Sequence, residues 1–276
     1  MINTWAICKR EFAAYFLTPI GYVVCGIFAL IAGLGFRALL LEYARMSQAP
    51  TDYGFTTVPD FGEFFLHPYL VFAGMIVVFL SPLITMRLMA EETHRGTAEQ
   101  LFTLPLRDRE IVFGKYLAAL AMLAVMMLVV GVHLAIVAYF VDIEPVALVC
   151  GLVGVFLMGA AFLSLGFFVS CLTRTQITAA TVTFGLIMAL FFAGNMAENL
   201  PEAQEIAVEG VGPLQPILIG GYRVIRTLLQ QLAADAHLEE LTLGVVRPQD
   251  VVYHVLFAAF FLFLTFRALE SRNWRA

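Results

Sequence analysis

Six long apolar stretches divide the chain, and the polar residues gather between them. Each stretch is close to the ~20 mainly apolar residues that an α-helix needs to cross the hydrocarbon core of a bilayer. The apolar residues run continuously and do not alternate with polar ones, which excludes the strands of a membrane β-barrel. The pattern predicts an all-α integral membrane protein with six transmembrane helices, at residues 20–41, 69–86, 116–141, 146–171, 177–195 and 251–268.

The first apolar stretch is expected to stay in the protein. It is too long for the core of a signal peptide, and its end, Gly33–Arg37, lacks the small-x-small pattern of a cleavage site. Small residues four apart predict close contacts between the spans. These pairs are Ala160 with Ser164, Gly166 with Ser170, and Gly185 with Ala189.

Composition supports a membrane protein and argues against a soluble domain, a nucleic-acid-binding protein and a metal-binding protein. Hydrophobic residues make up 61% and charged residues 13% of the 276 positions, whereas soluble domains have roughly 45–50% and 25%. The net charge of −5 argues against nucleic acid as a partner. The four cysteines lie in or beside apolar stretches without a CxxC pattern, and the five histidines lack metal-ligand spacing. We therefore expect no metal site.

The basic residues are unevenly distributed between the loops. With the N-terminus inside, the inner segments hold 11 of the 16 Lys and Arg residues and seven of the 21 acidic ones. The inside is then +4 and the outside −9. Because inner loops of membrane proteins are enriched in Lys and Arg, both termini are predicted to be cytoplasmic.

Two segments outside the spans show a helical pattern. Residues 1–19 carry an apolar stripe at Ile2, Trp5, Cys8, Phe12 and Phe16, which predicts an interfacial (elbow) helix on the inner leaflet, with a frayed terminus as the alternative. The outer loop 198–249 contains an amphipathic helix at 217–232. Three placements stay open for it: on the outer leaflet, re-entering between the last two spans, or on a partner.

The inner segment 87–115 is the only long one on its side. Good helix formers run from Arg87 to Phe102, and Glu91 lies four residues before Arg95, a spacing that supports an exposed helix. Pro105 ends this helix, and a second can begin near Asp108 as N-cap. A solvated connector is the alternative interpretation. A rigid helix between two spans is better suited to docking on another protein.

Three stretches of the sequence carry a family resemblance. The inner segment and its flanks contain Pro82-Leu83-Ile84-Thr85-Met86-Arg87, Glu91-Glu92, Arg95-Gly96-Thr97, Glu99, Leu104-Pro105 and Ile111-Val112-x-Gly114-Lys115. The ends add Lys9-Arg10-Glu11-Phe12, Thr18-Pro19-Ile20-Gly21-Tyr22, Arg247-x-x-Asp250-Val251-Val252-Tyr253 and Leu269-Glu270-Ser271-Arg272-x-x-Trp274. This pattern resembles exporter-type (type V) ABC transporter permeases, most of all the branch of the gliding-motility-associated permease. The outer segment after Pro213 is longer than that branch usually carries.

The resemblance implies a function and a set of partners. The inner segment would be the coupling helix that contacts the ATPase subunit, through Glu91, Glu92, Arg95, Gly96, Thr97 and Glu99. Residues 20–276 would form a six-helix permease domain that pairs with a second permease half, a copy or a paralogue. ATP would be bound by the partner subunit, so the chain itself needs no cofactor. The expected location is the bacterial cytoplasmic membrane, among membrane lipid and with an extracytoplasmic domain protein as a further partner.

Catalytic motifs are missing from the sequence. The Gly114-Lys115 pair is not a phosphate-binding loop, because Arg109 occupies the place of the first glycine and Tyr116 that of the Ser or Thr. No HExxH or GxSxG motif occurs. Arg37 and His133 are the candidate functional side chains within the spans, and neither lies beside an acidic one in a span. An intramembrane enzyme and an ion-coupled transporter are therefore disfavoured.

Two functional hypotheses remain. The first is a non-catalytic permease subunit that exports or extracts an apolar, amphipathic or protein-linked substrate, since the spans offer few fixed charges. The second is a membrane scaffold that anchors a partner complex without transport. They differ in whether nucleotide hydrolysis by the partner changes the conformation of the spans.

Overall fold

A computed structural model describes residues 2–54, 57–96, 107–198, 215–232, 236–245 and 247–273. Throughout these ranges the regular structure is helical, without a strand. The membrane-type helices are α2 (Pro19–Gln48), α3 (His67–Thr85), α6 (Asp108–Ala138), α7 (Pro145–Leu172), α8 (Gln176–Glu198) and α11 (Pro248–Asn273). The others are α1 (Ile2–Leu17), η1 (Pro50–Tyr53), η2 (Gly62–Leu66), α4 (Ala90–His94), α9 (Gln215–Leu232) and α10 (Ala236–Thr242).

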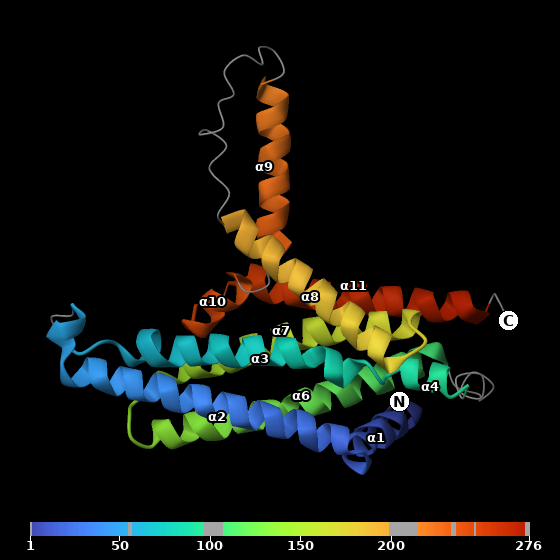
Figure 1. Cartoon of the computed structure of the whole chain (residues 1–276), viewed down its shortest axis with the longest axis horizontal. Coiled ribbons are helices and arrows are strands. Elements are labelled where there is room, and N and C mark those ends of the chain that lie inside the picture. The colour runs from blue at the N-terminus through green and yellow to red at the C-terminus, as the bar shows by residue number, and fades with distance from the viewer. Residues whose placement is uncertain are drawn as a thin grey trace.

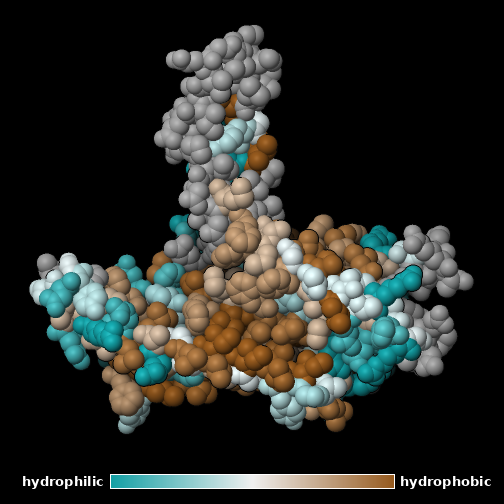
Figure 2. Space-filling view, viewed as in Figure 1, coloured by the Kyte–Doolittle hydropathy of each residue, from teal (hydrophilic) through white to brown (hydrophobic). Residues whose placement is uncertain are grey.

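The long helices lie side by side in one bundle (Figure 1). α1, α4, the N-terminus and the end of α11 lie at the same end of this bundle, while η1 and the connection from α6 to α7 lie at the other. Figure 2 shows apolar surface along the middle of the bundle and polar surface towards both ends. A belt of this kind is expected where lipid surrounds the middle of a protein.

Length and composition bear out the membrane class. Five helical segments of the described chain are long and apolar enough to cross a bilayer: 19–48, 62–94, 108–138, 145–172 and 248–271. The fifth predicted span falls on α8, whose apolar part is shorter, Gln176–Phe192. The fold is thus an all-α membrane protein, and most of its helices extend beyond the predicted apolar limits because the flanking polar residues continue the helix.

Proline sets the start of several helices. Pro19, Pro145 and Pro248 each occupy the first helical position of α2, α7 and α11, where the missing N–H would have no helical partner anyway. Thr18, in extended conformation, separates α1 from α2. The chain therefore turns sharply between α1 and α2.

The centre of the bundle is formed by α3 and α7. At least half of their most apolar windows is buried, against 17% for α2 and α11. A Cβ added at Gly166 of α7 would lie 2.2 Å from Thr85 Oγ1, and one at Gly159 would lie 2.8 Å from Val77. The close contact predicted at Gly166 is therefore confirmed. At Gly185 of α8 the space within 4 Å is open, so the expected contact there is wrong: α8 is not tightly packed along that face.

A small polar group lies between the spans. Tyr69 of α3 is fully buried, and its hydroxyl lies 2.6 Å from His133 Nδ1 on α6. The ring of Phe36 stacks on His133 at 4.8 Å. The interpretation of His133 as a hydrogen-bonded contact between helices is confirmed. Arg37 is exposed, as expected for a side chain that reaches out of the apolar layer.

The outer segment contains the predicted amphipathic helix as α9. It stands away from the bundle and runs across the direction of the spans (Figure 1), with its contacts to α8. α10 instead packs on α7 and α3, where the Thr242 hydroxyl lies 2.6 Å from His67 Nδ1. Of the three placements that the sequence left open, re-entry between the last two spans is not the one that α9 adopts in this structure.

Candidate functional site

The connection between α3 and α6 contains a short helix where the sequence predicts a coupling helix. Residues 87–89 form a turn, α4 covers only Ala90–His94, and Gly96 follows with φ +70°. The expected helix from Arg87 to Phe102 is therefore wrong in its length. A left-handed conformation ends a helix at little cost only where the residue has no Cβ, and Gly96 supplies that position. Thr97 and Glu99 lie outside the described residues.

The N-terminal end of α4 is held by α7. The Ser170 hydroxyl oxygen accepts hydrogen bonds from the backbone N–H groups of Met89 and Ala90, each 3.1 Å away. The same hydroxyl donates to the Met86 carbonyl at 3.2 Å. Ser170 is fully buried, so these backbone groups would have no water to replace it. This side chain thus fixes the end of α3 and the start of α4 to α7.

Glu91 joins the start of the connection to its exposed end. One carboxylate oxygen lies 3.3 Å from Arg87 Nε and the other 2.6 Å from Arg95 Nη2. Arg87 is nearly buried: it donates to the Thr18 hydroxyl at 2.7 Å and lies over the ring of Tyr15. Through Arg87 the turn before α4 is therefore tied to the junction of α1 and α2.

Glu92 binds a second buried cation. Its Oε1 atom lies 3.0 Å from Lys115 Nζ, and Glu11 Oε1 lies 3.2 Å from the same nitrogen. Arg10 contacts both carboxylates, at 2.6 Å from Glu11 and 3.5 Å from Glu92. We call these four residues the ion-pair cluster. They come from α1, α4 and α6, three segments that are distant in the sequence.

The electrostatics of the cluster are balanced. The side chain of Lys115 is 1% exposed and those of Glu11 and Glu92 are 15% and 18% exposed. Burial alone would raise the pKa of Glu11, but the charges and hydrogen bonds of Lys115 and Arg10 outweigh it and hold the pKa below its ordinary value. Two basic and two acidic side chains thus lie in direct contact, which limits the cost of burying them.

Close contact between α1 and α6 brings the cluster together. Gly114, the residue before Lys115, faces α1 so closely that an added Cβ would lie 2.8 Å from the Ile7 Cβ and 3.0 Å from the Thr4 carbonyl oxygen. Asn3 also donates to Glu110, 3.3 Å away. The apolar stripe predicted on α1 is divided, because Cys8 is buried against the protein and Trp5 is 68% exposed.

Replacing Gly114 with Ala is expected to push α1 away from α6. Overpacking of this kind costs roughly 1–3 kcal/mol, and here the backbone of α1 is one of the two obstacles. Thermal unfolding of the purified protein in detergent measures the loss. Gly131→Ala is the matched control on α6, since nothing lies within 4 Å of its added Cβ. Equal melting temperatures for the two variants would contradict the close contact of α1 with α6.

The predicted site residues separate into two groups. Glu91 and Glu92 face the protein, where the contacts just described engage them, whereas Arg95 and Gly96 are exposed at the end of α4. Sequence reasoning missed Glu11, Lys115, Arg87 and Ser170 as members of the site. The available signal was Lys115 itself, which follows Gly114 and directly precedes the predicted span at 116–141, since a cation at the edge of a span needs partners.

The contacts at α4 connect it to several neighbouring helices. Within the described ranges no group of three or more His, Cys, Asp or Glu side chains is arranged to hold a metal. α4 is instead connected to α7 by Ser170, to α6 and α1 by Glu92, and to the junction of α1 and α2 by Glu91 with Arg87. A force on α4 therefore reaches four helices through short contacts.

Comparison with known proteins identifies the family of the chain. The family model described as ABC-2 family transporter protein matches residues 5–274, nearly the whole chain. A search of curated proteins finds no match. The chain therefore belongs to the ABC-2 transporter family, that is, to the permease subunits of ATP-binding-cassette transporters.

Proposed function

We propose that this ABC-2 permease forms half of a translocation pathway and is driven by a separate ATPase that docks on α4. The observation that carries the proposal is the connection of α4 to α1, α6 and α7 through buried polar contacts. An isolated connector of five residues needs no such support. A helix that receives force from another subunit needs it, because otherwise the helix would move without the spans.

The exposed end of α4 is the proposed docking point. His94, Arg95 and Gly96 are exposed, and the Arg95 side chain is 67% exposed even while it pairs with Glu91. Glu91 and Glu92 hold the helix in place from within. The contact assigned to Thr97 and Glu99 by resemblance remains a part of the proposal. The end of the bundle with α4 and both termini is then cytoplasmic, as the basic residues favour.

Because the chain forms half of a pathway, the complete transporter contains a second permease half and two ATPases. Six membrane helices pair with six more from a copy or a paralogue, in the bacterial cytoplasmic membrane, and two ATPases move the two α4 segments. Residues 1–19 act as the elbow helix on the inner leaflet and residues 20–276 as the permease domain. We assign the chain to the gliding-motility-associated branch on its sequence pattern. α9 stands away from the bundle and is the proposed contact for an extracytoplasmic domain protein.

The side chains of the spans bear on the substrate class. Among the buried side chains of the described spans, Lys115, Asp250 and His254 are the ionisable ones besides tyrosine and cysteine, and the rest are apolar or carry a hydroxyl. This supports export or extraction of an apolar, amphipathic or protein-linked molecule. ATP hydrolysis belongs to the partner, so the permease itself contributes the path and the coupling.

Site-directed photocrosslinking tests the docking point. A photoreactive amino acid in place of Arg95 is expected to crosslink to a nucleotide-binding subunit in cells, because the side chain points outward from α4. The same amino acid at Tyr53, exposed at the opposite end of the bundle, is the control and should leave that subunit unlabelled. Labelling of the ATPase from Tyr53 but not from Arg95 would contradict the proposal.

The scaffold hypothesis makes a different prediction for the same complex. If the chain only anchors a partner, disulfide crosslinking rates between α3 and α8 stay constant when ATP is added. For a driven permease we expect these rates to change with nucleotide, since α4 continues directly from α3 and contacts α8.

A further inference from the structure

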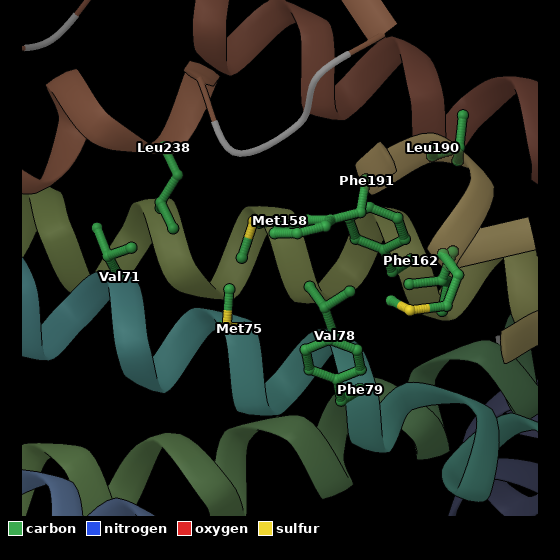
Figure 3. A pocket seen from close by; sticks show the side chains of 11 residues that line it. Val71, Met75, Val78, Phe79, Met158, Phe162, Leu190, Phe191 and Leu238 are labelled. Atoms are coloured by element: carbon green, nitrogen blue, oxygen red, sulfur yellow. The ribbon is translucent and has the colours of Figure 1, made fainter. Parts of the chain in front are cut away.

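An apolar hollow lies between α3, α7 and α8, beneath α10. Its 11 lining residues are Val71, Met75, Val78, Phe79, Met158, Phe162, Ile187, Met188, Leu190, Phe191 and Leu238 (Figure 3). The enclosed part of the hollow is small, about 50 Å³. One water molecule needs roughly 10–15 Å³ on this measure, so the hollow has room for a narrow chain end but not for a bulky ligand.

The hollow is not a sign of loose packing in the bundle. α3 and α7 are in tight contact beside it: a Cβ added at Gly74 would lie 2.8 Å from Met158 Cε, and one at Gly159 would lie 2.8 Å from Val77. Protein interiors of this kind leave few voids. The space arises because α8 is tilted away from α3 and α7 (Figure 1). The hollow therefore lies where α8 meets α3 and α7.

Its two ends are closed by side chains of neighbouring elements. Phe79 of α3 packs against Phe184 of α8, with ring centroids 6.1 Å apart, and Leu238 of α10 covers the other end (Figure 3). The hollow is open on one side, and Met75 of its lining is 37% exposed. All of this lies within the apolar belt, so the medium at the open side is lipid hydrocarbon.

The lining has the chemistry of a hydrocarbon site. None of the 11 side chains carries a nitrogen or an oxygen, and a water molecule needs two to four polar partners. Water is therefore a poor occupant. Three of the lining residues are methionines, whose flexible thioethers adapt to chains of different shape. A saturated or unsaturated acyl chain matches both properties.

We propose that this hollow binds one hydrocarbon chain of a lipid or of a lipid-like molecule, which enters sideways between α3 and α8. Burial of an alkyl chain supplies roughly 0.8 kcal/mol per methylene removed from water. A chain that comes from the bilayer is already out of water and gains much less. Preference for one chain over another therefore depends on how well its shape fits the hollow. The site itself is independent of the proposed function, and only the identification of the chain as cargo rests on it.

Photolabelling in nanodiscs tests the site without the ATPase. The probe is phosphatidylglycerol with a diazirine near the end of one acyl chain. We expect labelling of Met158 and Phe162, which are 4% and 5% exposed and lie inside the hollow. Met188→Trp and Met75→Trp fill the hollow from two walls and should each reduce this labelling about tenfold, the change given by about 1.4 kcal/mol. Leu128→Trp, on the exposed face of α6, is the control and should leave it unchanged.

The wild-type result decides the proposal even if a Trp variant does not fold. Labelling confined to lipid-facing side chains, or labelling of Met158 that persists in both folded variants, overturns it. A second arm adds the ATPase and ATP: a fall in labelling during turnover identifies the chain as cargo, and constant labelling identifies a resident lipid. Either outcome supports the site. Failure of ATPase association would contradict the proposed function and leave the labelling result intact.

Discussion

Replacing Lys115 with Met is expected to lower the stability of the permease more than any other single substitution among the charged residues around α4. The change leaves Glu11 and Glu92 facing each other, with Arg10 as their remaining cation in the cluster. Loss of one partner from a fully buried pair costs roughly 3–5 kcal/mol. The two carboxylates are 15% and 18% exposed, so partial hydration places the expected loss near the lower limit.

The melting temperature of the purified permease measures this loss, and a fall of about 5 °C or more is expected. Lys9→Met is the matched control, since Lys9 is exposed on α1. Lys115→Met combined with Glu11→Gln and Glu92→Gln should recover most of the stability, because the charge that remains, on Arg10, is 56% exposed and no buried charge is left unpaired. A single Lys115→Met variant as stable as Lys9→Met would show that the cluster does not hold α1, α4 and α6 together.

Reversing both carboxylates of α4, Glu91→Lys with Glu92→Lys, is expected to abolish association with the ATPase while the protein still inserts. The new cations would face Arg87 and Arg95 on one side and Lys115 and Arg10 on the other. Repulsion would then move α4 from its position on α7. Insertion depends on the apolar spans, which the change does not touch. Co-purification with the tagged permease measures the association.

A control with the same change of net charge is available. Glu42→Lys with Glu270→Lys reverses two acidic side chains that are 44% and 51% exposed, each in an exposed pair with a neighbouring arginine. Such exposed pairs contribute little to stability, about 0–1 kcal/mol, so ATPase association should be retained. Equal recovery of the ATPase with both double variants would contradict the role assigned to α4.

The sequence predicted the fold well because span length is a local property. A run of about 20 apolar residues can lie in the membrane only as a helix or a closed barrel, and the predicted stretches accordingly fall on α2, α3, α6, α7, α8 and α11. The start of α6 was predicted to within one residue: Asp108 is its first helical residue, and Glu110 accepts from the Arg107 N–H at 3.1 Å. The elbow helix was predicted for the same local reason.

The ion pairs around α4 were harder to predict, because they join segments that are distant in the sequence. Glu92 and Lys115 are 23 positions apart, and Glu11 and Lys115 are 104 apart. Helical spacing predicted the pair of Glu91 with Arg95, which the structure contains. For Ser170 the spacing predicted close packing of helices, but not the hydrogen bonds to the start of α4. The length of α4 was overestimated since good helix formers on both sides of Gly96 hid the position at which the backbone turns.

The central claim is that a separate ATPase drives this permease through α4. The most direct measurement is purification of the tagged chain from its native host in mild detergent, followed by mass spectrometry of the proteins that accompany it. We predict a stoichiometric subunit with a phosphate-binding loop, present with the wild-type chain and lost with Glu91→Lys/Glu92→Lys. Recovery of the wild-type chain without any nucleotide-binding subunit, under conditions that keep other transporters intact, would contradict the account.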